Sequence, residues 1–130
     1  MRDALLKVWW VGLGGFLGAN ARYWLGVWFE GRAKGPFPWA TFAINVSGSF
    51  LLGLFMVLGL ERQALPRDPV LRLLFAVGFL GAYTTFSTFT YETLVLAEAG
   101  APEKALANAA GSVAAGLLAA WLGMAVGRRF

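Results

Sequence analysis

Residues 78–90, GFLGAYTTFSTFT, decide which fold this chain can adopt. The stretch lies inside a long apolar segment, yet five of the seven residues from Thr84 to Thr90 are Ser or Thr. Hydroxyl side chains compete for the backbone hydrogen bonds of a helix, so helix propensity is poor here. In lipid, an unwound stretch survives only where protein buries it or where it lines a watery cavity. The pattern predicts a helix broken near mid-membrane with a binding site at the break; the alternative is a continuous helix whose hydroxyls bond to its own carbonyls.

The rest of the chain is apolar enough to sit in lipid. It has 130 residues, of which 58% are hydrophobic and only 14% are charged. A soluble domain of this size needs more charge to cover its surface, so the excess apolar side chains are expected to face a membrane. The chain has no Cys and no His, which excludes disulfides, the common zinc sites and His-based catalysis.

Four apolar segments are separated by short polar loops. Each segment reaches the ~20 residues that cross a bilayer core, and each loop combines charge with Gly or Pro. The segments are residues 5–29, 39–60, 71–96 and 105–126, and the loops are residues 30–36, 61–69 and 98–104. We therefore predict an all-α membrane protein, with residues 1–130 as a single domain of four transmembrane helices. The first segment is too long for a signal peptide, sequential helices should be antiparallel neighbours, and both termini should lie on one side.

The basic residues suggest an orientation for this domain. Seven Lys or Arg residues fall on the side that holds the termini and the second loop, against four on the other side. The larger group contains Arg2, Lys7, Arg62, Arg67, Arg72, Arg128 and Arg129. Because cytoplasmic loops carry the excess of positive charge, this modest bias favours cytoplasmic termini.

Neutral polar side chains form rows on two of the predicted helices. Thr41, Asn45 and Ser49 are spaced four residues apart and share one helix face, as do Asn108 and Ser112. Neutral hydrogen-bond donors on facing helices suit a small anion, because they stabilise its charge without trapping it as a fixed cation would.

Hydrogen bonding between helices is the alternative explanation for these rows. It is the preferred explanation for Ser47 and Ser49. For Asn45 we favour a functional role, because a large amide is costly to bury without a dedicated partner.

Charged residues inside the helices are few, and nothing resembles a catalytic site. Arg22 lies about 21 Å along the helix axis from Val8, where its head can reach water and attract an anion into a vestibule. Anchoring, or pairing with a carboxylate such as Glu92, is the alternative. The Gly14-xxx-Gly18 spacing indicates close helix packing. With no embedded carboxylate pair, nucleophile–base pair or phosphate loop, the chain is not expected to be an enzyme.

Taken together, three of these segments resemble the signature sequences of the Fluc (CrcB) family of bacterial fluoride channels. They are GGFLGANARY at residues 14–23, TFAINVSGSFLLG at residues 41–53 and GFLGAYTTFSTF at residues 78–89. The resemblance spans essentially the whole chain, including its length and helix count.

The resemblance implies a fluoride-selective passive channel that lowers cytoplasmic fluoride across the bacterial inner membrane. It also implies an antiparallel, dual-topology dimer with two pores. A structural sodium ion would lie at the dimer interface, held by the backbone carbonyls of Gly81 and Thr84. We expect a homodimer; an oppositely oriented paralogue as partner is the alternative.

The resemblance also assigns a fluoride pathway. Its residues would be Thr41, Asn45, Thr85, Phe86, Phe89, Asn108 and Ser112. Lys104 departs from the expected pattern, because it stands one turn before Asn108 where an uncharged side chain is expected.

Two other functions are compatible with four short apolar helices. A small multidrug-type antiporter would exchange protons for cations at an embedded carboxylate, and the first helix has none between Asp3 and Glu30. A non-transporting membrane scaffold would not need a broken polar helix.

Overall fold

The computed structural model describes residues 2–61 and 69–130, and its regular structure in those ranges is entirely helical. The all-helical prediction is therefore confirmed. Most of the predicted second loop, with Arg62 and Arg67, lies outside the described residues. The elements are α1 (Arg2–Glu30), α2 (Trp39–Met56), η1 (Val57–Glu61), α3 (Pro69–Leu71), η2 (Arg72–Leu80), α4 (Gly81–Tyr83), α5 (Phe86–Glu98) and α6 (Pro102–Gly127), where η marks π-helical turns.

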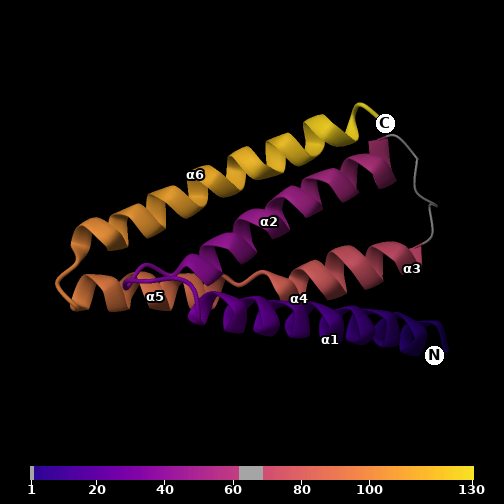
Figure 1. Cartoon of the computed structure of the whole chain (residues 1–130). Helices are drawn as coiled ribbons and strands as arrows, with labels where there is room; N and C mark the ends of the chain where they lie inside the picture. Colours follow the sequence, from indigo (N-terminus) through magenta and orange to yellow (C-terminus); the bar gives the residue numbers. More distant parts are fainter. Residues whose placement is uncertain (1, 62–68) are drawn as a thin grey trace.

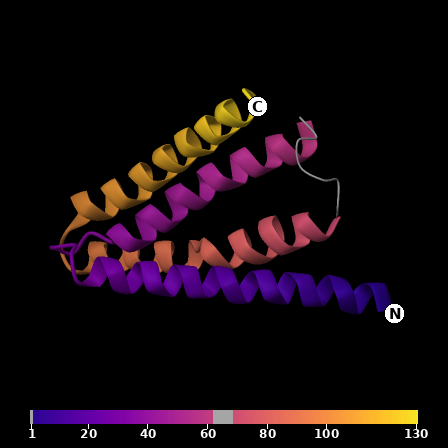
Figure 2. The ribbon, with the colours of Figure 1, turned by 45° about the vertical axis from the view of Figure 1, so that its right-hand side comes forward.

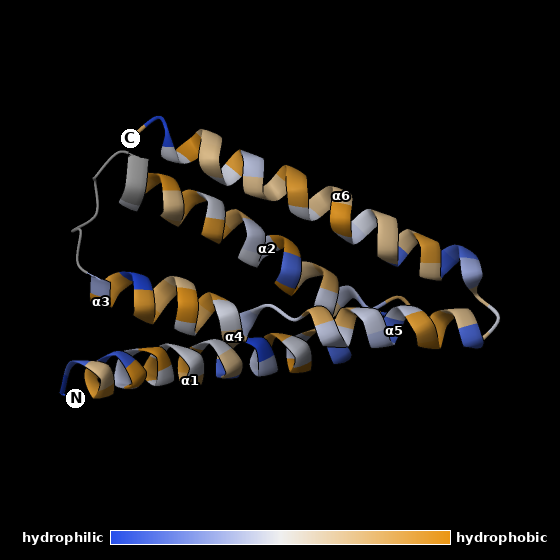
Figure 3. Ribbon diagram, turned by 180° about the vertical axis from the view of Figure 1, so that it is seen from behind, coloured by the Kyte–Doolittle hydropathy of each residue, from blue (hydrophilic) through white to orange (hydrophobic). Residues whose placement is uncertain are grey.

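Within the described residues, three helical stretches are long and apolar enough to cross a membrane: Trp39–Gly59, Pro69–Glu98 and Pro102–Gly127. The helix α1 has 29 residues but is less apolar, because it carries Trp, Tyr, Asn and Arg side chains. Figure 3 shows that most visible positions of α2 and α6 are apolar, whereas α1 has several hydrophilic positions along its length. A helix that is apolar on every side suits a lipid environment.

The four long helical stretches pack in alternate pairs. Consecutive stretches run in opposite directions, and both termini lie at the same end of the molecule (Figure 1). However, α1 packs mainly along η2 and α4, and α2 packs mainly along α6. Each of these pairs is parallel, and the two pairs diverge towards the termini (Figure 2). Sequential helices are antiparallel, as predicted, and α1 and α2 contact each other, but the main partners of α1 are η2 and α4 and the main partner of α2 is α6.

Glycines explain which helices pair. A Cβ atom at Gly14 would collide with the backbone of Leu74, and one at Gly18 would collide with the backbone of Phe79. Between α2 and α6, a Cβ atom at Gly123 would likewise collide with the backbone of Phe50. Small residues let helix backbones approach closely, and in lipid such packing replaces the hydrophobic effect as the driving force. The close-packing interpretation of Gly14-xxx-Gly18 is confirmed.

The predicted break is present about midway along Pro69–Glu98. The helix α4 ends at Tyr83, and the next two residues are extended, with φ −78° and ψ 158° at Thr84 and φ −149° and ψ 117° at Thr85. The helix α5 then begins at Phe86, and the Thr85 hydroxyl caps it by accepting from the Thr88 N–H at 3.3 Å. The alternative considered above was a continuous helix whose hydroxyls bond to its own carbonyls. The helix is broken, but one such bond is present, because the Thr84 hydroxyl donates to the Leu80 carbonyl at 2.9 Å.

Candidate functional site

A groove of about 360 Å³ lies beside the break and gathers polar side chains from three helical stretches. Its lining residues are Asn45, Gly48, Ser49, Leu52, Ala76, Leu80, Gly81, Thr84, Thr85, Phe86, Phe89, Ser112 and Val113. Most of the predicted site residues therefore lie together, although they come from distant parts of the sequence. Two residues of the predicted pathway, Thr41 and Asn108, are not among the lining residues.

Asn45 is bound to the break at two points. Its side-chain Nδ2 donates to the Thr85 carbonyl at 3.0 Å, and its Oδ1 accepts from the Thr85 N–H at 2.9 Å. The carboxamide thus pairs with Thr85 as one peptide group pairs with another across two strands. Asn45 lines the groove, and the second N–H of its amide has no hydrogen-bond partner in the part of the chain that the structure describes.

The backbone carbonyls of Gly81 and Thr84 lose their regular helical donors at this break. In an α-helix they would accept from the N–H groups of residues 85 and 88. Here the Thr85 N–H is bound by Asn45, and the Thr88 N–H is bound by the Thr85 hydroxyl. These are the two carbonyls that the family resemblance implies as sodium ligands. Neutral oxygens without a competing donor are suitable ligands for a hard cation, so the chain's own residues fit that ion.

Two phenylalanine rings follow the break on the first turns of α5. The ring centroids of Phe86 and Phe89 are 5.8 Å apart, and the ring planes are inclined at 44°. Phe86 is 77% exposed in the single chain. One copy of the chain therefore leaves the groove open beside this ring and does not form a closed constriction.

A hydrogen-bonded chain links the groove to the interface between α5 and α6. The Ser112 hydroxyl donates to Asn108 Oδ1 at 3.3 Å, Asn108 Nδ2 donates to Thr93 Oγ1 at 2.8 Å, and Thr93 donates to the Phe89 carbonyl at 2.7 Å. Asn108 is fully buried. Ser112 therefore faces the groove, whereas Asn108 lies behind its wall and ties α6 to α5.

The charged residues predicted near the site do not pair with each other. The Thr41 hydroxyl donates to Glu92 Oε1 at 3.0 Å, and Glu92 Oε2 is buried with no hydrogen-bond partner among the described residues. Arg22 makes no ion pair with any described residue, so the suggested pairing of Arg22 with Glu92 is wrong for the single chain. The reason is that α1 packs against η2 and α4, while Glu92 lies on α5 and faces α2. Lys104 is exposed on the first turn of α6.

Two further residues at the break, Tyr83 and Gly48, were not singled out from the sequence. The hydroxyl groups of Ser47 and Tyr83 lie 2.9 Å apart, and a Cβ atom at Gly48 would collide with the Thr84 methyl group. Tyr83 is also the last ring of a stack that begins at Phe75 and continues through Phe79. The only sequence signal for Gly48 was its place between the polar residues of the Asn-Val-Ser-Gly-Ser motif.

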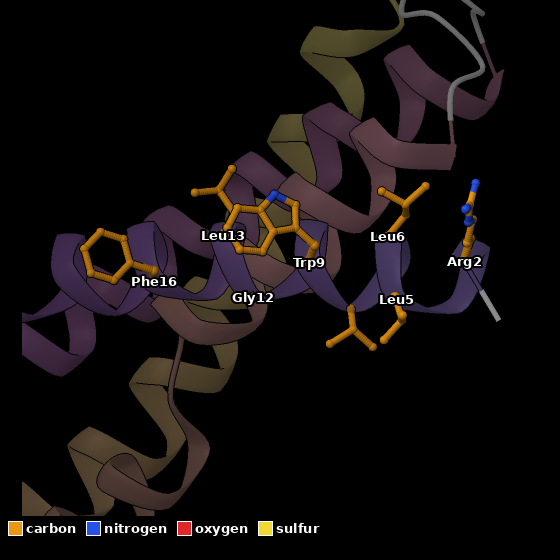
Figure 4. Close-up of a pocket in the computed structure, with 8 residues that line it drawn as sticks. Arg2, Leu5, Leu6, Trp9, Gly12, Leu13 and Phe16 are labelled. Carbon is orange, nitrogen blue, oxygen red and sulfur yellow. The ribbon is translucent and has the colours of Figure 1, made fainter.

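A larger hollow of about 880 Å³ runs along the first half of α1 (Figure 4). Apart from Arg2 and the indole N–H of Trp9, its lining side chains are hydrocarbon, including that of Phe16. Such a surface suits lipid and offers no set of donors for a small ligand. The groove at the break is therefore the candidate site.

The fold and the groove define a small helical membrane protein with a neutral, polar site at an interrupted helix. A family model described as CrcB-like protein, Camphor Resistance (CrcB), matches residues 9–124, and the chain belongs to this family.

The relatives in this family are close. The chain is 51% identical over 124 residues to the fluoride-specific ion channel FluC of Acidobacterium capsulatum, covering 95% of this chain and 98% of that protein. It is 48% identical over 122 residues to fluoride-specific ion channel FluC 2 of Moorella thermoacetica, covering 93% and 97%. It is 50% identical over 117 residues to FluC of Thermus thermophilus, covering 90% of each chain. The resemblance seen in the sequence is confirmed.

Proposed function

We propose that this protein is a fluoride-selective passive channel that lets fluoride leave the bacterial cytoplasm across the inner membrane. The main support for this function is the groove of uncharged hydrogen-bonding groups at the break, in a chain whose relatives are named fluoride-specific ion channels. Relatives of this kind perform no covalent chemistry, so the protein is not an enzyme.

Four membrane crossings are part of this proposal. The helix α1 has 29 residues, and at 1.5 Å per residue it measures about 43 Å, which exceeds the roughly 30 Å of a hydrocarbon core. It packs along η2 and α4, which belong to a stretch that is apolar enough to span. A helix held parallel to a spanning helix over several turns spans the same layer. In this arrangement α1 is the fourth membrane-crossing helix, and its polar side chains lie within the membrane.

The groove can conduct because its attraction for an anion is moderate. Its hydrogen-bond donors are amide and hydroxyl groups, and its aromatic rings have positively polarised edges. Neither kind of group carries a formal charge, so the anion is stabilised but is free to leave. Asn45 and Ser112 line the groove together with the rings of Phe86 and Phe89.

A second, antiparallel copy of the chain would complete this site. Phe86 is 77% exposed, and Gly81 is exposed as well, so the groove and the break both present surface that a partner can cover. Two copies related by a two-fold axis would bring together four carbonyl oxygens, those of Gly81 and Thr84 in each chain. Such a cage suits sodium, which would supply a positive charge that joins the two copies. The weak bias of the basic residues is compatible with a homodimer inserted in both orientations.

The alternatives lose their support once the family is known. A multidrug-type antiporter or a non-transporting scaffold would not be 51% identical over nearly its whole length to a fluoride-specific channel.

Fluoride efflux from liposomes tests the proposed function. The purified full-length protein would be reconstituted into vesicles loaded with potassium fluoride, and a fluoride electrode would record release after an ionophore is added. Vesicles loaded with chloride, or with a quaternary ammonium dye, are the selectivity controls. We expect fluoride to leave and both controls to stay. Fluoride release no faster than from protein-free vesicles, or equal release of chloride, would exclude a fluoride-selective channel.

A further inference from the structure

The break is attached to α2 at three nearby positions. Asn45 makes both of its hydrogen bonds with the Thr85 backbone, Ser47 meets the Tyr83 hydroxyl, and Gly48 leaves room for the Thr84 methyl group. Three successive residues, Tyr83, Thr84 and Thr85, are thus each contacted by a polar or small residue of α2. This arrangement fixes the shape of the break from outside the broken helix.

The donor bound by Asn45 is the one that would close the break. If residues 81–85 formed a continuous helix, the Thr85 N–H would bond to the Gly81 carbonyl. The Oδ1 atom of Asn45 takes that N–H at 2.9 Å, and Nδ2 holds the Thr85 carbonyl at 3.0 Å. The Thr84 backbone, at ψ 158°, lies far from helical values as a result.

We infer that Asn45 is a positioning residue that holds the break open, and that it creates the cation site by removing the helical donor from the Gly81 carbonyl. The first half of this inference stands on the hydrogen bonds alone. The second half rests on the sodium ion of the proposed function. Asn45 therefore acts on transport through the backbone of Thr85, in addition to any direct contact with an anion.

Few residue types at position 45 could bind both the N–H and the carbonyl of Thr85. Only a carboxamide of this length presents a donor and an acceptor side by side at the spacing of a peptide group. A carboxylate keeps an acceptor for the Thr85 N–H but places a second acceptor against the Thr85 carbonyl. Gly48, one turn further along α2, is equally constrained, because any side chain there would meet Thr84.

Backbone carbon chemical shifts of Thr84 and Thr85 test the inference directly, because they report whether these residues are extended or helical. The full-length protein would be labelled on threonine and studied in lipid by solid-state NMR, as wild type and as Asn45→Ala. We expect extended shifts in the wild type and a displacement towards helical values in Asn45→Ala. We also expect the sodium concentration that half-stabilises the protein against heat to rise roughly tenfold, as loss of two hydrogen bonds of ordinary strength predicts.

Two matched variants complete the test. Ser47→Ala removes the neighbouring bond to Tyr83 but leaves the Thr85 backbone alone. Asn20→Ala removes an amide that, among the described residues, bonds to the Phe16 carbonyl in its own helix. Both should keep the wild-type shifts at residues 84 and 85. If Asn45→Ala keeps these shifts while fluoride flux is lost, Asn45 is a fluoride ligand only and the inference is wrong. Equal displacement by Ser47→Ala would also overturn it.

A measurement on the wild type keeps the inference testable even if Asn45→Ala does not fold. The Thr85 N–H should exchange with solvent deuterium as slowly as the helical amides around it, because Asn45 protects it. Exchange at the rate of an unbonded amide would contradict the proposed bond. None of these shifts or exchange rates depends on fluoride conduction, so a failure of the inference and a failure of the proposed function give different results.

Discussion

At the scale of single residues, the site is built from uncharged groups whose hydrogen bonds are mostly used within the protein. Ser49 donates to the Asn45 carbonyl, Thr84 donates to the Leu80 carbonyl, and Ser112 donates to Asn108. An anion in the groove therefore meets a limited number of free donors. The remaining N–H of Asn45 is the one that both the sequence and the geometry single out.

Asn45→Asp is expected to reduce transport strongly. The carboxylate loses the donor to the Thr85 carbonyl and places a negative charge beside the path of an anion. At a separation of about 5 Å and an effective dielectric constant of about 20, the repulsion of roughly 3 kcal/mol lowers flux by about two orders of magnitude. Fluoride efflux from liposomes measures the effect, and gel filtration checks that the assembly persists. Unchanged efflux would remove Asn45 from the pathway.

Phe86→Ile and Phe89→Ile should each reduce fluoride flux sharply while the protein stays assembled. Isoleucine keeps much of the bulk but lacks the positive ring edge that can stabilise an anion weakly. An edge contact worth about 1 kcal/mol corresponds to a roughly fivefold loss per ring. Phe16→Ile is the matched control, because Phe16 is an exposed ring on α1 outside the groove. If both groove variants conduct like the wild type, the rings serve only for packing.

The sequence predicted which residues line the groove better than it predicted which side chains contact each other. Neutral polar residues at helical spacing identified Asn45 and Ser112, because period and polarity are visible in a sequence. The burial of Asn108 behind the groove and the separation of Arg22 from Glu92 were not visible. They depend on which helices pack together, and spacing along one helix does not contain that information.

At the scale of helices, the break and the pairing have different origins. A high density of hydroxyl residues weakens the helix locally, so the break at Thr84 and Thr85 could be predicted from the sequence. The glycines at positions 14 and 18 predicted a close approach but not the identity of the partner. The π-helical turns of η2 had no signal in the sequence that we identified.

Gly14→Ala should destabilise the protein, whereas Gly12→Ala should not. The added methyl group at position 14 would meet the Leu74 backbone, while nothing lies within 4 Å of one at position 12. Backbone atoms cannot turn aside as a side chain can, so we expect a loss of about 1–3 kcal/mol in the free energy of unfolding. Thermal unfolding in detergent compares the two variants. A smaller loss for Gly14→Ala than for Gly12→Ala would show that α1 does not pack on η2 in this register.

At the scale of the whole molecule, the single chain leaves its site unfinished. The groove is open at Phe86, and the carbonyls of Gly81 and Thr84 lack their regular helical donors. The proposed antiparallel dimer and its sodium ion would complete both.

Removal of sodium should therefore weaken the assembly. An ion that binds only the native dimer stabilises it by about 2.7 kcal/mol at a concentration one hundred times its dissociation constant. We expect exhaustive replacement of sodium by N-methylglucamine to lower the melting temperature and the dimer fraction, with recovery when sodium is returned. Full thermal stability and full activity without sodium would argue against an ion at the interface.

The alternate pairing of the helices has a consequence for how the chain is made. As the chain leaves the ribosome, α1 and α2 enter the membrane before their main partners exist. The surface of α1 at Gly14 and Gly18 can pack only after η2 has been synthesised. The surface of α2 around Phe50 can pack only after α6, with its Gly123, has been synthesised. Native packing therefore depends on the last helix synthesised. A nascent chain stalled before residue 102 would leave the α2 surface that α6 covers exposed to lipid.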